Sequence, residues 1–296
     1  MSEAEHGEAE AGTESIDPAT AFSIIGNGTR LEILEALSEA AETPMRFSDL
    51  YRRVDVDDSA QFNYHLGELR GSFVEKVDGG YELREAGRKV VSAIVAGSFT
   101  ERPEIEPFDV GDPCVVCGAG LRARYADEQL VIECPDCGHG HGEYTFPPGG
   151  LEDRSREEIL GAFNERVRHL HCLAADGVCP ECSGRMETEI RDDPACCLGV
   201  NVQAHHACTR CGHEVCSVVG LVLLDDADVT AFHRDHGIDL STARYWTLEW
   251  CVSDEHTEVL DRDPARIAVT IPLNDEEMRV VLDDALGVED VTRTPA

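Results

Sequence analysis

The first hundred residues carry apolar side chains at helical spacing in several short runs. The pattern over residues 19–40 is interrupted by two glycines, which predicts a short helix and then a longer one that starts near Thr29. Two more helices are predicted, one over residues 48–54 and one that begins after the capping sequence at 57–59. In the last of these, Phe62, Leu66 and Leu69 form the inward face.

Two alternating segments follow, residues 73–77 and 81–84, on either side of the turn sequence Asp78-Gly79-Gly80. Such a pattern predicts a β-hairpin. A further helix is expected over residues 85–99. Helices, hairpin and final helix occur in the order of a winged helix-turn-helix, in which the helix before the hairpin enters the major groove of DNA.

Cysteines dominate the pattern further along the chain. Two Cys-x-x-Cys pairs separated by sixteen residues match the spacing of a zinc ribbon, in which two turns present four thiolates to one tetrahedral ion. Glycine follows the second cysteine of each pair, where the turn favours it. The predicted ligands of this first site are Cys114, Cys117, Cys134 and Cys137.

A second set of pairs predicts a second zinc site with the ligands Cys179, Cys182, Cys208 and Cys211. The insertion between these pairs holds Cys196 and Cys197, either of which is an alternative ligand. Four thiolates leave no open position, so both zinc ions are expected to be structural and nearby histidines such as His139 and His141 to be bystanders. No phosphate-binding loop or nucleophile motif is present, which predicts a protein that is not an enzyme.

The sequence thus predicts an α+β fold with a winged helix-turn-helix, two zinc-ribbon-like β segments joined by a helix, and a small mixed α/β region. In that last region we expect a helix near 225–236 and strands over 245–252 and 267–273. The expected segments are an acidic disordered tail (1–17), the DNA-binding domain (18–100), a linker (101–113), zinc ribbon 1 (114–150), the connecting helix (151–176), zinc ribbon 2 (177–224) and the C-terminal region (225–296).

Charge changes this picture in one respect. The formal net charge is -34, and Lys76 and Lys89 are the only lysines among 25 basic residues. An acidic surface that uses arginine is suited to molar salt, which screens self-repulsion within about 3 Å. The acidic N-terminal segment lacks the basic residues of a signal peptide, so the expected location is the cytoplasm. No apolar run approaches the length of a membrane span, so no membrane partner is expected.

The helix that begins at residue 59 carries side chains suited to reading DNA. Gln and Asn pair with adenine, and Ser, Tyr and His contact bases or phosphates. Residues 59–89 hold five basic and five acidic residues, whereas residues 101–296 carry about -24 of the net charge. The predicted DNA contacts are Ser59, Gln61, Asn63, Tyr64, His65, Arg70, Lys76 and Arg84.

The run Phe62-Asn63-Tyr64-His65-Leu66, followed by Phe73-Val74-Glu75 and by Gly79-Gly80-Tyr81-x-Leu83-x-x-x-Gly87, resembles the ArsR-like winged-helix regulators, in particular their halophilic archaeal forms. The resemblance covers residues 18–98. It implies that residues 59–65 lie on the recognition helix and that the protein is a homodimer on palindromic double-stranded DNA. Residues 18–98 contain no cysteine, so the metal-sensing pair of some family members is absent.

The main hypothesis is therefore a sequence-specific transcription regulator with an unidentified effector. One alternative is a zinc-stabilised module that binds proteins of the transcription machinery. Another is a thiol redox sensor, for which the neighbouring Cys196 and Cys197, or Cys216, would be the reactive groups.

Overall fold

The computed structural model describes residues 16–41, 43–192 and 200–296. It is a mixed α+β structure with four antiparallel sheets among these residues. The chain divides between Thr100 and Glu101 into two compact units. Within the described ranges, no helix is both long enough and apolar enough to cross a membrane.

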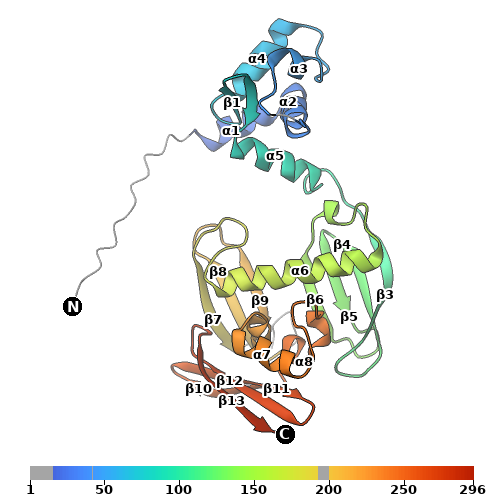
Figure 1. The fold of residues 1–296 in the computed structure, drawn as a ribbon, viewed down its shortest axis with the longest axis vertical. Coiled ribbons are helices and arrows are strands. Elements are labelled where there is room, and N and C mark those ends of the chain that lie inside the picture. Colours follow the sequence, from blue (N-terminus) through green and yellow to red (C-terminus); the bar gives the residue numbers. More distant parts are fainter. Residues whose placement is uncertain (1–15, 42, 193–199) are drawn as a thin grey trace, which may run out of the picture. The chain divides into compact units, whose positions relative to one another are not determined.

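The first unit consists of five helices and one hairpin (Figure 1). Each of the three longer helices before the hairpin begins at a residue whose side chain accepts a backbone hydrogen bond, namely Asp17, Asn27 and Asp58. These contacts satisfy donors that a helix start leaves open. The elements are α1 (Pro18–Ile25), α2 (Gly28–Ser38), α3 (Phe47–Tyr51), α4 (Ser59–Leu69), β1 (Val74–Val77), β2 (Gly80–Leu83) and α5 (Glu85–Val95).

One apolar core holds the first unit together. Phe62, Leu66 and Leu69 of α4 are buried, as the helical pattern predicts. The hairpin turns at Gly79, whose φ of 96° is a conformation that glycine adopts without the steric cost of a Cβ. Gly80 then passes so close to residue 45 that a Cβ would lie 2.2 Å from the Met45 carbonyl oxygen, and Met45 pairs with Tyr81 beside the hairpin.

The second unit begins with a four-stranded meander and a long helix. The strands are β3 (Ile105–Pro113), β4 (Gly120–Ala126), β5 (Gln129–Glu133) and β6 (Gly140–Thr145), in sheet order β3-β4-β5-β6. After a turn of 3₁₀-helix (Pro148–Gly150), α6 runs from Arg156 to Ala175. Ser155 and Glu158 form a capping box at its start.

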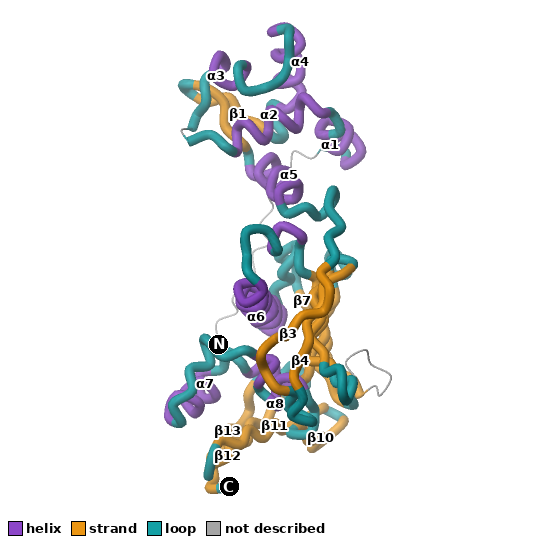
Figure 2. The backbone as a smooth tube through the Cα atoms, turned by 90° about the vertical axis from the view of Figure 1, so that its right-hand side faces the viewer, coloured by secondary structure: helices purple, strands orange, loops and turns teal. Residues whose placement is uncertain are grey.

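A three-stranded sheet, short helices and a second four-stranded sheet complete the unit. In Figure 1, α6 passes alongside both the β3–β6 and the β7–β9 sheets, and in Figures 1 and 2 α8 lies beside the last sheet. The elements are β7 (Met186–Asp192), β8 (Val202–Cys208), β9 (Glu214–Val218), a 3₁₀-helix (Val219–Leu223), α7 (Ala227–Asp235), a 3₁₀-helix (Tyr245–Thr247), α8 (Glu249–Val252), β10 (Thr257–Arg262), β11 (Ala265–Leu273), β12 (Glu276–Leu282) and β13 (Val288–Pro295).

Most of the second unit shares one apolar core. Phe163 of α6 is fully buried and packs with Trp246, which is also fully buried. The inner face of the last sheet, including Ile267 and Val280, belongs to the same core. The C-terminal region is therefore packed onto the first sheet and α6. A smaller cluster, which includes Ala174 and Met186, lies between α6 and the β7–β9 sheet.

Two expectations differ from this structure. Residues 105–113 were expected within a linker, but they form β3, because Phe108 and Val110 are buried against the neighbouring strand and α6. Residues 245–252 were expected as a strand and instead form a 3₁₀ turn and α8. Tyr245, Trp246 and Trp250 lie on these helical turns, and their side chains are buried in the core.

Candidate metal centres and nucleic-acid interface

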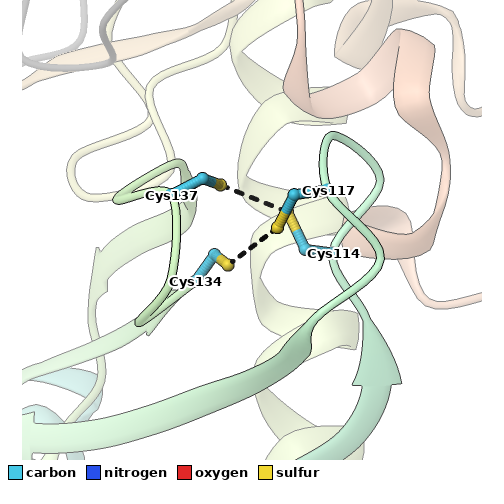
Figure 3. A group of neighbouring side chains, drawn as sticks. All are labelled: Cys114, Cys117, Cys134 and Cys137. Atoms are coloured by element: carbon cyan, nitrogen blue, oxygen red, sulfur yellow. Dashed lines mark hydrogen bonds between the residues drawn. The ribbon is translucent and has the colours of Figure 1, made fainter.

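The first four cysteines lie together at one end of the β3–β6 sheet (Figure 3). Cys114 and Cys117 occupy the turn between β3 and β4, and Cys134 and Cys137 the turn between β5 and β6. The Sγ atoms of Cys114 and Cys137 are 3.7 Å apart, and those of Cys117 and Cys134 are 3.5 Å apart. All four sulfur atoms lie within 4.8 Å of one another.

The turn that carries each pair is shaped for this arrangement. The amide of Gly118 donates to the Cys114 carbonyl at 2.9 Å, and Gly118 has a φ of 78°. The amide of Val116 points at the Cys114 Sγ atom at 3.4 Å. Amides directed at sulfur favour the thiolate form, and the amide of Cys137 lowers the pKa of Cys134 to about 7.

These sulfur positions fit a tetrahedral metal. A tetrahedron with metal–sulfur bonds of about 2.3 Å has sulfur–sulfur edges of about 3.8 Å. The measured separations of 3.5 Å and 3.7 Å are close to that edge. They are far longer than the roughly 2.05 Å of a disulfide bond.

The second cluster repeats this geometry between α6 and β9. Cys179 and Cys182 precede β7, Cys208 ends β8, and Cys211 lies in the turn between β8 and β9. The Sγ separations are 3.7 Å for Cys179–Cys211 and 3.5 Å for Cys182–Cys208. The two clusters are therefore compatible with two structural metal sites. The alternative ligands Cys196 and Cys197 lie outside the described residues.

Sequence reasoning did not foresee how tightly His141 is tied to the first cluster. Its ring lies between the Cys114 Sγ atom, 3.3 Å from Nε2, and the Trp246 carbonyl oxygen, 3.0 Å from Nδ1. The side chain is buried, and burial lowers its pKa. His139 instead contacts the Val252 carbonyl oxygen at 2.9 Å. Neither histidine is within the four-cysteine group, but both connect it to the C-terminal region.

Two further histidines form buried contacts that the sequence pattern does not reveal. His171 of α6 is 2.9 Å from the Tyr144 hydroxyl, and His206 of β8 is 2.9 Å from the Thr188 hydroxyl. Both rings are essentially inaccessible to solvent. Helical spacing could have indicated the burial of His171, which follows Val167 by four residues on α6, whereas the adjacency of His205 and His206 in a strand does not indicate burial.

The expected DNA-contacting residues separate into two groups. Ser59, Gln61, Asn63 and Tyr64 are exposed on α4, and 56% of the Tyr64 surface is accessible. Among the basic residues expected to contact phosphates, Arg70, Lys76 and Arg84 are also exposed, next to or within the hairpin. Arg84 donates to the carbonyl oxygen of Gly71.

His65 does not belong with the exposed group. It is 7% exposed, and its Nδ1 atom accepts a hydrogen bond from Arg30 Nε at 3.4 Å. Because His65 is three residues after Phe62 on a helix, the two side chains share the inward face. The expectation that His65 reads bases is corrected by its burial and by this partner.

The second unit is thus a mixed α+β structure that brings eight cysteines into two four-cysteine clusters. A family model described as a domain of unknown function (DUF7351) matches residues 111–288, more than half of the chain, and the chain belongs to this family. A second model, also described as a domain of unknown function (DUF7347), matches residues 18–94 in the first unit. Comparisons with curated proteins and with solved structures give no match.

Proposed function

We propose that this chain is a sequence-specific DNA-binding transcription regulator whose first unit is a winged helix-turn-helix and whose second unit is stabilised by two structural zinc ions. The observation that carries the proposal is the two-sided character of α4. Its inward face packs Phe62, Leu66 and Leu69 into the core, while Gln61 and Asn63 face solvent. Amides of this kind can pair with adenine in the major groove.

The elements around α4 support the same reading. α3 precedes it, and the β1–β2 hairpin follows it in the position of a wing. Arg70 and Lys76 are exposed next to α4 and on the hairpin, where they would contact phosphates. The resemblance of residues 18–98 to ArsR-like regulators agrees with this order.

Charge supports recognition by bases more than by phosphates. Residues 59–89 carry equal numbers of acidic and basic residues in a chain with a net charge of -34. Counterion release contributes little to affinity at molar salt, so binding there must depend on base contacts and on DNA shape.

We further propose that the regulator is a homodimer. The most exposed apolar side chains of the first unit are Phe22 on α1 at 70%, Val95 at the end of α5 at 68%, and Phe99 at 78%. Association of two copies through α1 and α5 would remove these side chains from water, and a contiguous apolar patch is what marks such a surface. A dimer would match the two halves of a palindromic site.

The DNA proposal is tested by selecting genomic fragments with the purified protein in molar KCl. The test variant is Gln61→Ala/Asn63→Ala, and Ser92→Ala on the exposed side of α5 is the matched control. We expect the parent and the control to enrich one motif, and the double variant to bind it about tenfold or more weakly, because each lost bidentate pair costs about 1–3 kcal/mol. Equal enrichment by the double variant, or no motif for the parent, would refute the assignment of α4.

The zinc proposal is tested by measuring metal content. Two clusters predict two metal ions per chain, and Cys117→Ser should leave one. Cys172→Ser, outside both clusters, is the control and should keep both ions. A parent protein that retains full stability after chelation contradicts a structural role.

A further inference from the structure

A cavity of about 440 Å³ lies between the middle and C-terminal part of α6, the loop after β6 and the turn that carries Cys179 and Cys182. We name it the α6 groove. Its volume is within the range of small-molecule sites, roughly 300–1,000 Å³. No residue of the groove is a member of the cysteine clusters or of α4, so the proposed function does not account for it.

The α6 groove is basic in an acidic unit. Two arginines, Arg154 and Arg166, line it together with His169, against one acidic residue, Glu181. Residues 101–296 as a whole carry a net charge of about -24. A neighbouring cavity, which shares Arg166 and Glu181 with the groove, has the opposite balance, since Glu143 and Glu214 also line it and His213 is its one histidine.

Both groove arginines keep most of their donors available. Arg154 donates to the Gly150 carbonyl oxygen at 2.8 Å, and Arg166 donates through Nε to the Thr145 carbonyl oxygen at 3.0 Å. Within residues 16–41, 43–192 and 200–296, neither forms a salt bridge with a carboxylate. A guanidinium has five N–H donors, so neutral carbonyl anchors hold both groups in place without neutralising them.

Several other arginines of the same unit pair with carboxylates. Arg168, also on α6, pairs with Asp225 at 3.2 Å, and Arg293 pairs with Asp235 at 2.8 Å. Arg154 and Arg166 instead donate to neutral carbonyl oxygens, as Arg122 does to that of Pro107, and so keep their positive charge in the groove.

The rest of the lining is apolar. Phe146 and Leu170 lie along it, and Leu173 is 41% exposed although it is a large aliphatic residue. Covering this surface would gain free energy in proportion to the apolar area that is removed from water. An inorganic anion cannot cover it, whereas an anion with an apolar body can.

We propose that the α6 groove binds a small amphipathic carboxylate, with the acid group held by Arg154 and Arg166 and the aliphatic or aromatic body against Leu170 and Leu173. Planar guanidinium groups suit carboxylates through paired hydrogen bonds. The apolar contact persists at molar salt, which screens charge over a few ångströms. If the chain regulates transcription, this groove is the site of its effector, but the binding itself does not depend on DNA recognition.

The test is isothermal titration of the full-length, metal-loaded chain in molar KCl without DNA. The probes are phenylacetate and decanoate, the neutral analogue phenylacetamide, inorganic phosphate, and a peptide with the sequence of the acidic residues 1–15. We expect both carboxylates to bind, phenylacetamide and phosphate to bind about tenfold more weakly or not at all, and the peptide not to compete.

Variants locate the binding. Arg154→Gln/Arg166→Gln should weaken both carboxylates about tenfold or more, and Leu173→Ser should weaken decanoate. Arg185→Gln, an exposed arginine that does not line the groove, is the matched control. Circular dichroism and metal content verify that each variant is folded.

Four results would overturn the proposal: no binding of either acid, equal binding of phenylacetamide, undiminished binding by the double arginine variant, or binding of the acidic peptide in place of the acids. Because the titration contains no DNA, a failure here leaves operator selection by α4 unaffected, and a failure of that selection leaves the groove result standing.

Discussion

Asp112 connects the first cysteine cluster to the C-terminal region, and its replacement by alanine should destabilise the second unit. The carboxylate accepts hydrogen bonds from Arg244 Nη1 and from Trp246 Nε1, each at 2.8 Å. Trp246 is fully buried, and its carbonyl oxygen contacts the ring of His141. Loss of the Asp112 carboxylate therefore leaves a buried indole N–H without its acceptor.

The magnitude follows from two contributions. A buried donor without a partner costs about 1–3 kcal/mol. The ion pair adds at most about 1 kcal/mol, because both side chains are partly exposed and Arg244 keeps its contact with Glu157. Asp112→Ala should thus lower the free energy of unfolding by about 1–4 kcal/mol, or roughly 2–16 °C in midpoint for a unit of this size.

The assay is thermal unfolding of the metal-loaded protein, followed by tryptophan fluorescence at Trp246 and Trp250. Asp112→Asn keeps an acceptor for the indole and should lose only about 1 kcal/mol. Asp109→Ala on the same strand is the matched control, because that carboxylate is exposed and accepts only from the amide of Gly111. If Asp112→Ala is no less stable than Asp109→Ala, the indole contact does not stabilise the unit as argued.

Two further predictions concern the same core. Gly142→Ala would place a Cβ 2.0 Å from the buried hydroxyl of Tyr245, so it should lower the free energy of unfolding, measured by chemical denaturation, by about 1–3 kcal/mol. Gly161→Ala is the control: a Cβ there meets open space on α6, so that variant should be neutral or stabilising. Equal stability of the two variants would contradict the close contact at Gly142. Burial, with a smaller effect of a neighbouring histidine, lowers the pKa of His171 to about 3. The unfolded chain then binds the proton first, near pH 6.5, so His171 alone should lower stability by about 2 kcal/mol between pH 7 and 5, and His171→Gln should remove that share. His206, whose pKa burial lowers to about 4, contributes a separate loss that the variant keeps.

Much of the local structure was predictable from residue patterns. The capping sequence before α4 and the turn at Gly79 lie where the sequence places them, and α6 lies within the segment expected as the connecting helix. Their determinants are local, namely a side-chain acceptor before a helix or a glycine with positive φ. The cysteine clusters were also predictable, because the spacing of each pair fixes a turn that presents two sulfur atoms.

The remaining features depend on contacts between distant segments. The acidic, proline-containing sequence of residues 105–113 indicates a linker until Phe108 is seen buried against α6. The burial of His65, by contrast, could have been predicted from the sequence, since Phe62, His65, Leu66 and Leu69 lie on one helical face. The α6 groove could not have been predicted in this way, because its walls come from segments that are far apart in sequence: the loop after β6, α6 and the turn with Cys179 and Cys182.

The division of cysteines between the two units has a consequence for how the chain responds to metal supply. A metal that binds only the folded second unit stabilises it by mass action, about 1.4 kcal/mol per site for each tenfold rise in free metal above the dissociation constant. Residues 18–98 contain no cysteine and have their own apolar core, so the first unit lacks this dependence. Starvation for metal would therefore weaken one half of the molecule while the other half remains folded, and the two halves would differ in their exposure to cellular proteases.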